Sequence, residues 1–195
     1  MENQAMDAEM AALSSRYAVA EMLLSGITTV LDMYYFEEVV AKVMDEMGIR
    51  GIAGETVMET DSCDSENTDQ AIERGLALIA AYKDHPRVSG TLTPHGTTTC
   101  SPETLKRVYE EDVKAGSVFT LHTAEMDYEM TQIREQYGMT PVEFLEHIGV
   151  LGPNTLTAHT IHATERDVEI LAKHGASVAH CIASNTKAGK GVAPV

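Results

Sequence analysis

Apolar residues along the chain follow two spacings, which change where glycine, proline or clustered polar residues interrupt them. Helical spacing covers residues 10–25, 37–47, 69–83, 101–114 and 164–175, and further helical segments follow residue 122. Short β-branched or apolar runs lie between the helices, at residues 27–33, 50–57, 87–93, 117–122, 154–159 and 176–183. We therefore predict six strands that alternate with helices, and we expect the helix at 10–25 to be amphipathic.

Two of the predicted helices carry recognisable start signals. Ser101 can accept a hydrogen bond from a free backbone N–H group, and Pro102 suits the first helical position. Thr140-Pro141-Val142-Glu143 matches a capping box, in which the threonine and glutamate side chains each bind a backbone N–H group of the other residue. These signals predict where the two helices begin.

The alternation of strands and helices predicts an α/β fold. No two strands are joined by a hairpin signal, so right-handed βαβ units and a parallel sheet are expected. A glycine-rich dinucleotide fingerprint and a phosphate-binding P-loop are both missing. Residues able to do chemistry instead follow nearly every strand, as they do in a (β/α)8 TIM barrel. Six strands do not close such a barrel, so the sheet is either open or part of something longer.

Composition restricts the partners of the chain. The 195 residues are 44% hydrophobic and carry a formal net charge of −16, which disfavours nucleic acid and anionic membrane surfaces. No apolar run approaches the length that spans a bilayer. Three scattered cysteines fit neither a disulfide framework nor a zinc ribbon, and they indicate a reducing cytoplasm. A small neutral or cationic molecule is the expected partner.

Two histidine-containing stretches are the strongest candidates for chemistry. His122 lies at the end of a predicted strand and is followed by Glu125, while His159 ends the next strand along the chain. Neutral imidazoles suit Zn²⁺ and similar divalent ions, and a carboxylate beside such an ion can carry protons for an activated water. The two stretches together therefore indicate a metal-assisted hydrolase.

Several motifs in the chain resemble the amidohydrolase superfamily. They are HTAE at 122–125, GMTPVEFLE at 138–146, AHTIH at 158–162, VAHCIASNTK at 178–187 and GVAP at 191–194, with PH at 94–95 and TCS at 99–101. Within that superfamily they are most similar to the branch of 5-methylthioadenosine/S-adenosylhomocysteine deaminases, triazine chlorohydrolases and guanine deaminases. The resemblance covers nearly the whole chain, and the combination of motifs is specific.

The resemblance implies a role for each site residue. His122 would be a ligand of one divalent metal, zinc or alternatively iron. Glu125 would contact the substrate and shuttle a proton, and burial near the metal is expected to raise its pKa. His159 would polarise the reacting oxygen and contact substrate, His95 would contact substrate, and residues 184–185 would close the floor of the site.

The implied reaction is hydrolysis at a C–N bond of a purine nucleoside or a related N-heterocycle, which would make the protein a deaminase. A triazine-type chlorohydrolase is the alternative within the same chemistry. A third reading is a fragment without activity of its own, because the family's His-x-His ligand pair and its last aspartate ligand have no counterpart in these 195 residues.

By this mapping the chain is a partial TIM barrel that holds barrel strands two to seven. Residues 1–195 would form one incomplete domain that lacks the first and last strands. A homo-oligomer is expected for the full-length form.

Two other features are predicted to be structural. His180 lies within the last apolar run and is expected to be a hydrogen-bonded histidine of that strand, whereas His162 is either a partner of the site residues or a polar loop residue. The acidic loop at 61–66 lacks the ligand spacing and glycine of a calcium loop, so we expect it to be solvated.

Overall fold

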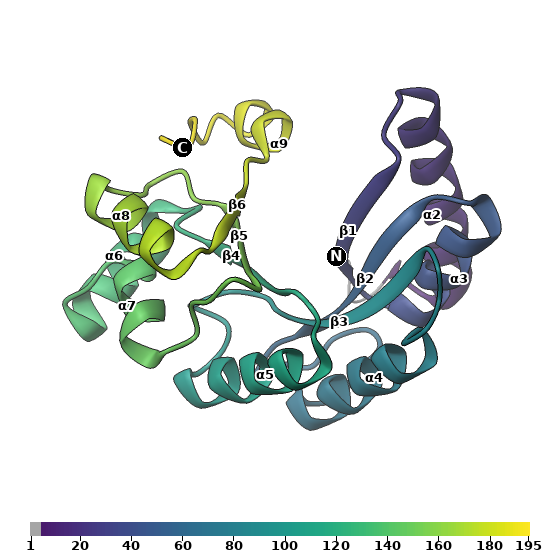
Figure 1. The fold of residues 1–195 in the computed structure, drawn as a ribbon, viewed down its shortest axis with the longest axis horizontal. Helices are drawn as coiled ribbons and strands as arrows, with labels where there is room; N and C mark the ends of the chain where they lie inside the picture. Colours follow the sequence, from purple (N-terminus) through teal and green to yellow (C-terminus); the bar gives the residue numbers. More distant parts are fainter. Residues whose placement is uncertain (1–4) are drawn as a thin grey trace. The chain divides into compact units, whose positions relative to one another are not determined.

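A computed structural model describes residues 5–195 of the chain. Its contacts divide the chain into two compact units, which meet in sequence between Thr93 and Pro94. Each unit contains a three-stranded parallel sheet with helices between the strands (Figure 1). The predicted parallel α/β fold is therefore confirmed. Among these 191 residues, no helix has both the length and the apolar composition needed to cross a bilayer.

The first unit contains the sheet β1-β2-β3. Its elements are α2 (Ala8–Leu24), β1 (Thr29–Tyr34), α3 (Glu37–Met47), β2 (Arg50–Val57), α4 (Thr68–Ala81) and β3 (Val88–Pro94). Helices α3 and α4 both pack on β2, and α2 packs on α3 (Figure 1). The core that results is formed mainly by Val40, Met44, Ile49, Ala53 and Val88.

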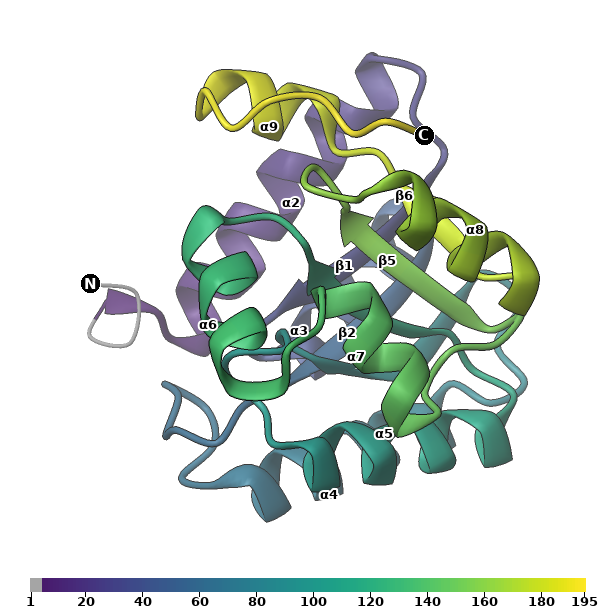
Figure 2. The same cartoon turned by 90° about the vertical axis from the view of Figure 1, so that its left-hand side faces the viewer.

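The second unit contains the sheet β4-β5-β6. Its elements are α5 (Pro102–Ala115), β4 (Phe119–Thr123), α6 (Asp127–Tyr137), α7 (Pro141–Ile148), β5 (Thr155–His159), α8 (Glu165–His174), β6 (Ser177–Ala179) and α9 (Ile182–Lys187). Helix α6 packs on α7 and α7 on α8 (Figure 2). Phe119, Leu121, Phe144, Leu145 and Ile170 are among its buried residues.

Both predicted helix starts are confirmed. The Ser101 side chain accepts a hydrogen bond from the N–H group of Thr104. Thr140 and Glu143 form the complete capping box at the start of α7. These caps satisfy N–H groups that no helical carbonyl can reach.

The prediction for the last strand is wrong in length. Strand β6 covers only Ser177–Ala179, and the apolar residues expected to extend it lead into helix α9. In this helix the Asn185 N–H group bonds to the Cys181 carbonyl and the Thr186 hydroxyl to the Ile182 carbonyl. His180 consequently lies outside the strand and is exposed, so its predicted structural role is also wrong.

Helix α2 does not have the predicted amphipathic character. Only Ala11 and Val19 are buried among its residues. Leu13, Tyr17 and Leu24 are respectively 63%, 68% and 90% exposed, although the sequence gives them an apolar spacing. The helix therefore buries a narrow line of residues against α3 and leaves large apolar side chains outside it.

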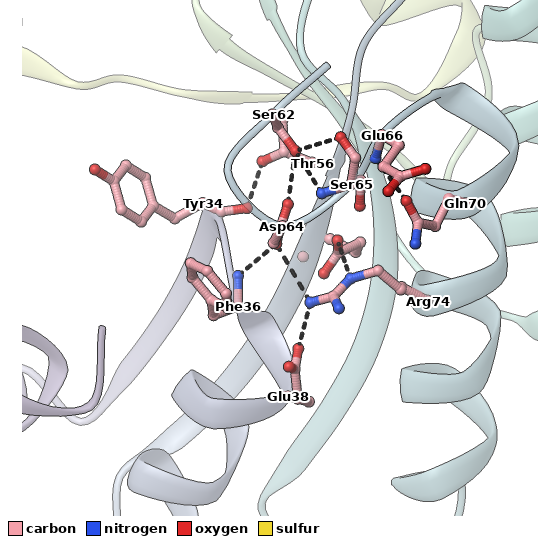
Figure 3. Close-up of polar contacts among 12 residues, drawn as sticks. Tyr34, Phe36, Glu38, Thr56, Ser62, Asp64, Ser65, Glu66, Gln70 and Arg74 are labelled. Atoms are coloured by element: carbon pink, nitrogen blue, oxygen red, sulfur yellow. Dashed lines mark hydrogen bonds and ion pairs between the residues drawn. The ribbon is translucent and has the colours of Figure 1, made fainter. Parts of the chain in front are cut away.

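The acidic loop at 61–66 is not uniformly solvated as predicted. The Asp64 side chain is only 1% exposed. Its carboxylate accepts hydrogen bonds from the N–H group of Phe36, the N-cap residue of α3, and from the Ser62 hydroxyl, and it pairs with Arg74 on α4 (Figure 3). Asp64 thus ties together the segments that follow β1 and β2.

Candidate active site

The four predicted site residues all lie in the second unit. His95 directly follows β3, His122 lies in β4, Glu125 comes two residues after β4, and His159 is the last residue of β5. Strands β4 and β5 are parallel, with Thr123 opposite His159. Because parallel strands present their carboxyl ends at one edge of a sheet, these side chains can meet.

Three imidazole rings form a row at this edge. The ring centroids of His95 and His122 are 4.9 Å apart, and those of His122 and His159 are 5.3 Å apart. Burial and the neighbouring His122 lower the pKa of His95, although Glu125 partly opposes this effect. His95 is therefore neutral at pH 7 and can both donate and accept a hydrogen bond.

The tautomer of His122 is fixed by the backbone. Its ring Nδ1 lies 2.8 Å from the backbone carbonyl oxygen of His95, and the backbone N–H group of His122 donates to the same oxygen at 3.1 Å. A carbonyl oxygen can only accept, so Nδ1 carries the hydrogen and Nε2 keeps its lone pair. A histidine held in this way is prepared to bind a metal through Nε2.

His159 is held by a hydrogen bond at one ring nitrogen and lies near the Glu125 carboxylate at the other. Its Nδ1 lies 2.7 Å from Oδ1 of Asn185, and its Nε2 lies 3.6 Å from Oε1 of Glu125. The residue is 7% exposed and Asn185 is fully buried. Asn185 therefore directs Nε2 of His159 towards the Glu125 carboxylate.

The backbone at this edge adopts unusual conformations. Ala124, His159 and Thr160 have φ angles of 49°, 70° and 52°. Such left-handed conformations are uncommon outside glycine and are unfavourable for β-branched residues. Non-glycine residues held in this region are concentrated at functional sites, so the strain supports the assignment of a site here.

Glu125 differs from the prediction in its electrostatics. Burial raises its pKa, but a hydrogen bond from Lys190 and the charges of His159, Lys190 and His122 outweigh burial, and the net pKa is lowered. The side chain is 16% exposed and its Oε1 pairs with Nζ of Lys190. The expected raised pKa is therefore wrong for this arrangement, because a cation from the C-terminal segment stabilises the carboxylate.

Replacement of Lys190 should reverse this shift. In Lys190→Met, burial would act on Glu125 without the ammonium group, so the pKa of Glu125 should rise. A titration of the Glu125 side-chain carboxyl carbon by NMR measures the change. Lys187→Met, which removes an exposed lysine from α9, is the matched control. An unchanged Glu125 pKa in Lys190→Met would show that the ion pair does not form in solution.

Sequence reasoning missed two residues of this site. Lys190 is 65 residues from Glu125, and no local pattern joins them. Glu129 is a buried carboxylate on α6 that binds the backbone beside Glu125. Its position in the first turn of α6, four residues after Glu125, was the available signal, since carboxylates favour helix N-termini.

Other candidate residues lie outside this cluster. His162 is 3.6 Å from Asp127, whose side chain is 97% exposed, so it belongs to the polar loop rather than to the row of imidazoles. Asp32 and Glu55, which also follow the pattern of polar residues near strand ends, lie in the first unit. There they are close to Glu37, and burial raises the pKa of all three carboxyl groups.

The donors for a metal ion are only partly present. His122 is oriented as a single ligand through Nε2. Within the part of the chain that the structure describes, no three His, Cys, Asp or Glu side chains are grouped so that they could hold a metal ion. A zinc site usually needs three or four protein ligands, so these residues supply an incomplete set.

Comparison with known proteins agrees with the geometry. The chain matches the amidohydrolase family over residues 1–195. It is 38% identical over 177 residues to a 5-methylthioadenosine/S-adenosylhomocysteine deaminase of Aquifex aeolicus. It is 39% identical over 180 residues to 5-methylthioadenosine/S-adenosylhomocysteine deaminase 2 of Archaeoglobus fulgidus. Each alignment covers 91% of the chain, but only 41% and 43% of these relatives.

The chain also resembles solved structures of a deaminase and a chlorohydrolase. An adenosine deaminase from Xanthomonas campestris with bound zinc superposes with a TM-score of 0.95 at 28% identity, over 99% of the chain and 44% of that protein. A zinc complex of an atrazine chlorohydrolase from Arthrobacter aurescens TC1 superposes with a TM-score of 0.83 at 26% identity, over 92% of the chain and 44% of that protein.

The relatives and solved structures named above are deaminases and a chlorohydrolase, which are all hydrolases. The chain belongs to the amidohydrolase family. It spans less than half the length of the curated relatives it matches.

Proposed function

We propose that the protein is a metal-dependent aminohydrolase that acts on a C–N bond of a purine nucleoside or a related N-heterocycle. The observation that carries the proposal is the arrangement of His122, Glu125 and His159 at one sheet edge, with His159 Nε2 3.6 Å from the Glu125 carboxylate. The naming of the relatives as deaminases supports the substrate class. The chain would contribute barrel strands two to seven of one incomplete domain.

Zinc would be held in part by His122, and when bound it would supply an activated water and an electrophile. Glu125 would accept a proton at its carboxylate and deliver it to a ring nitrogen of the substrate. The Glu125 carboxylate is ionised at neutral pH and can accept a proton, but its lowered pKa makes it a weaker base than a carboxylate whose pKa lies near 7. His159 would donate or accept a hydrogen bond at the reacting oxygen through Nε2, since Asn185 holds its Nδ1.

His95 would contact the substrate. Its neutral ring lies beside His122, and its Nδ1 is 3.0 Å from the Thr99 hydroxyl, which fixes the ring. A neutral imidazole with one nitrogen already bonded presents the other to a nucleobase or a ribose hydroxyl. The remaining partners would be further copies of the chain in a homo-oligomer, and the expected compartment is the cytoplasm.

The test combines metal content with product release. The purified chain is loaded with zinc, its zinc content is measured by elemental analysis, and ammonia release is followed with adenosine, 5-methylthioadenosine and S-adenosylhomocysteine. We expect His122→Ala to lower zinc content and to abolish ammonia release. His147→Ala, which removes an exposed histidine from α7, should leave both unchanged.

The outcomes separate the alternatives. Chloride release from a chlorinated triazine without ammonia release from any adenosine compound would favour a chlorohydrolase. Zinc retention by His122→Ala would contradict the assigned ligand. An absence of both zinc and turnover in the wild-type chain would show that the 195 residues do not act alone.

A further inference from the structure

We propose that Glu129 is a positioning residue that holds together the two loops carrying His95 and Glu125. The kinetic part of this inference rests on the proposed function, whereas its structural part does not. Glu129 is 5% exposed and lies in the first turn of α6. Its carboxylate accepts three hydrogen bonds, and none of the donors belongs to its own helix.

The three donors come from both loops. Oε1 of Glu129 accepts from the Thr97 hydroxyl at 2.7 Å and from the N–H group of Ala124 at 3.1 Å. Oε2 accepts from the N–H group of Glu125 at 2.9 Å. Thr97 is two residues after His95 and is also buried. One carboxylate therefore joins the loop after β3 to the loop after β4.

The backbone held by Glu129 is the strained part of the loop. Ala124 has a φ angle of 49°, and its carbonyl accepts a hydrogen bond from the N–H group of His162 at 2.9 Å. Its N–H group is bonded to Glu129. Bonds on both sides of one residue fix a conformation that alanine rarely adopts. This conformation sets the direction in which the next residue, Glu125, leaves the sheet.

An ordinary helix cap does not account for these contacts. A glutamate at the third helical position of a capping box binds the N–H group of the cap residue, which for α6 is Met126. Glu129 instead binds the two residues before Met126 and a hydroxyl from another loop. Its side chain therefore serves the segment that carries Glu125 rather than the end of α6.

The test compares Glu129→Gln with Glu135→Gln. Both replace a glutamate of α6, but Glu135 is exposed. The amide introduced by Glu129→Gln cannot accept a hydrogen bond through its nitrogen, so at least one of the three donors loses its partner. We expect amide hydrogen exchange at Ala124 or Glu125 to accelerate on the order of tenfold in Glu129→Gln, with exchange in β4 and β5 unchanged. Glu135→Gln should match the wild type.

Two results would overturn the inference. Exchange at Ala124 and Glu125 that stays at the wild-type rate in Glu129→Gln would show that the carboxylate does not hold this backbone. An equal acceleration throughout the second unit would show that Glu129 acts only on overall stability. If Glu129→Gln does not fold, Thr97→Val replaces it as the test, because it removes one of the three donors at nearly constant volume. Without the bond from Thr97, the Glu129 carboxylate should hold the N–H group of Ala124 less firmly, so exchange at Ala124 should accelerate.

Kinetics provide a separate measurement in an active preparation. A displaced Glu125 should lower kcat by roughly 10- to 100-fold, and release of the loop that carries His95 should raise KM as well. Glu129→Asp should not restore activity, because its carboxylate is one carbon shorter. Absence of turnover in the wild-type chain would count against the proposed function alone, since the exchange experiment still decides the role of Glu129.

Discussion

Arg74→Met is expected to destabilise the first unit by about 3–5 kcal/mol. Arg74 donates to Glu55 at 3.1 Å. It also donates to Glu38 at 2.8 Å and to Asp64 at 3.3 Å (Figure 3). The side chains of Glu55 and Asp64 are only 2% and 1% exposed. Methionine has a similar length but no charge, so Asp64 would remain buried beside other carboxyl groups without a cation. Breaking one side of a buried ion pair costs more than the pair contributes.

Urea denaturation followed by circular dichroism measures the change, and Arg16→Met is the matched control. Arg16 pairs with Glu46 at 2.8 Å, but both side chains are more than 40% exposed. Loss of an exposed pair should cost less than about 1 kcal/mol. If the two variants unfolded at the same urea concentration, the network around Asp64 would not contribute to stability.

The fold was predictable because most of its signals are local. Strand β2 occupies the predicted residues 50–57, and α7 begins at the predicted capping box. Both signals depend on residues within a few positions of one another. Helix α2 shows the limit of this reasoning, since Leu13 and Tyr17 have a helical apolar spacing but are exposed. Spacing predicts a helix, whereas burial depends on what the rest of the molecule places against it.

Without the family resemblance, the candidate site was predictable only where strand order determines it. His122 and His159 lie at the ends of adjacent parallel strands, so their proximity follows from topology. Residues 184–185 were expected at the site only from the family resemblance, and Lys190 was not predicted; both Asn185 and Lys190 lie in the segment after β6. Their contacts depend on how the chain turns after β6, and apolar spacing carries no information about that turn.

Glu125 illustrates why a pKa cannot be inferred from burial alone. Burial does raise its pKa, as expected, but the hydrogen bond from Lys190 and the nearby imidazoles have a larger combined effect. Glu55 shows the opposite balance. Burial and the Asp64 carboxylate raise its pKa to about 8, although Arg74 is a direct partner. The outcome at each carboxyl group depends on the number of opposite charges that reach it.

The stability of the first unit should decrease as the pH rises from about 4.5 to about 8. Burial and the neighbouring carboxylates of Asp32 and Glu55 raise the pKa of Glu37 well above its ordinary value, and the pKa of Glu55 is about 8. The folded chain therefore keeps protons that the unfolded chain releases near pH 4.5. Each retained proton makes the free energy of unfolding fall by about 1.4 kcal/mol per pH unit within this range.

Glu37→Gln isolates one of these protons, because glutamine matches the protonated glutamate in shape and does not titrate. The free energy of unfolding is measured by urea denaturation at several pH values from 4 to 8. The free energy of unfolding of Glu37→Gln should fall less steeply with pH than that of the wild type. At pH 8 the variant should be the more stable protein. Glu73→Gln, at an exposed position on α4, makes the same replacement outside the buried cluster and should keep the wild-type slope. That control separates burial of Glu37 from the repulsion caused by the net charge of −16. A wild-type stability that increased from pH 5 to pH 8 would mean that Glu37 and Glu55 are ionised in the folded chain.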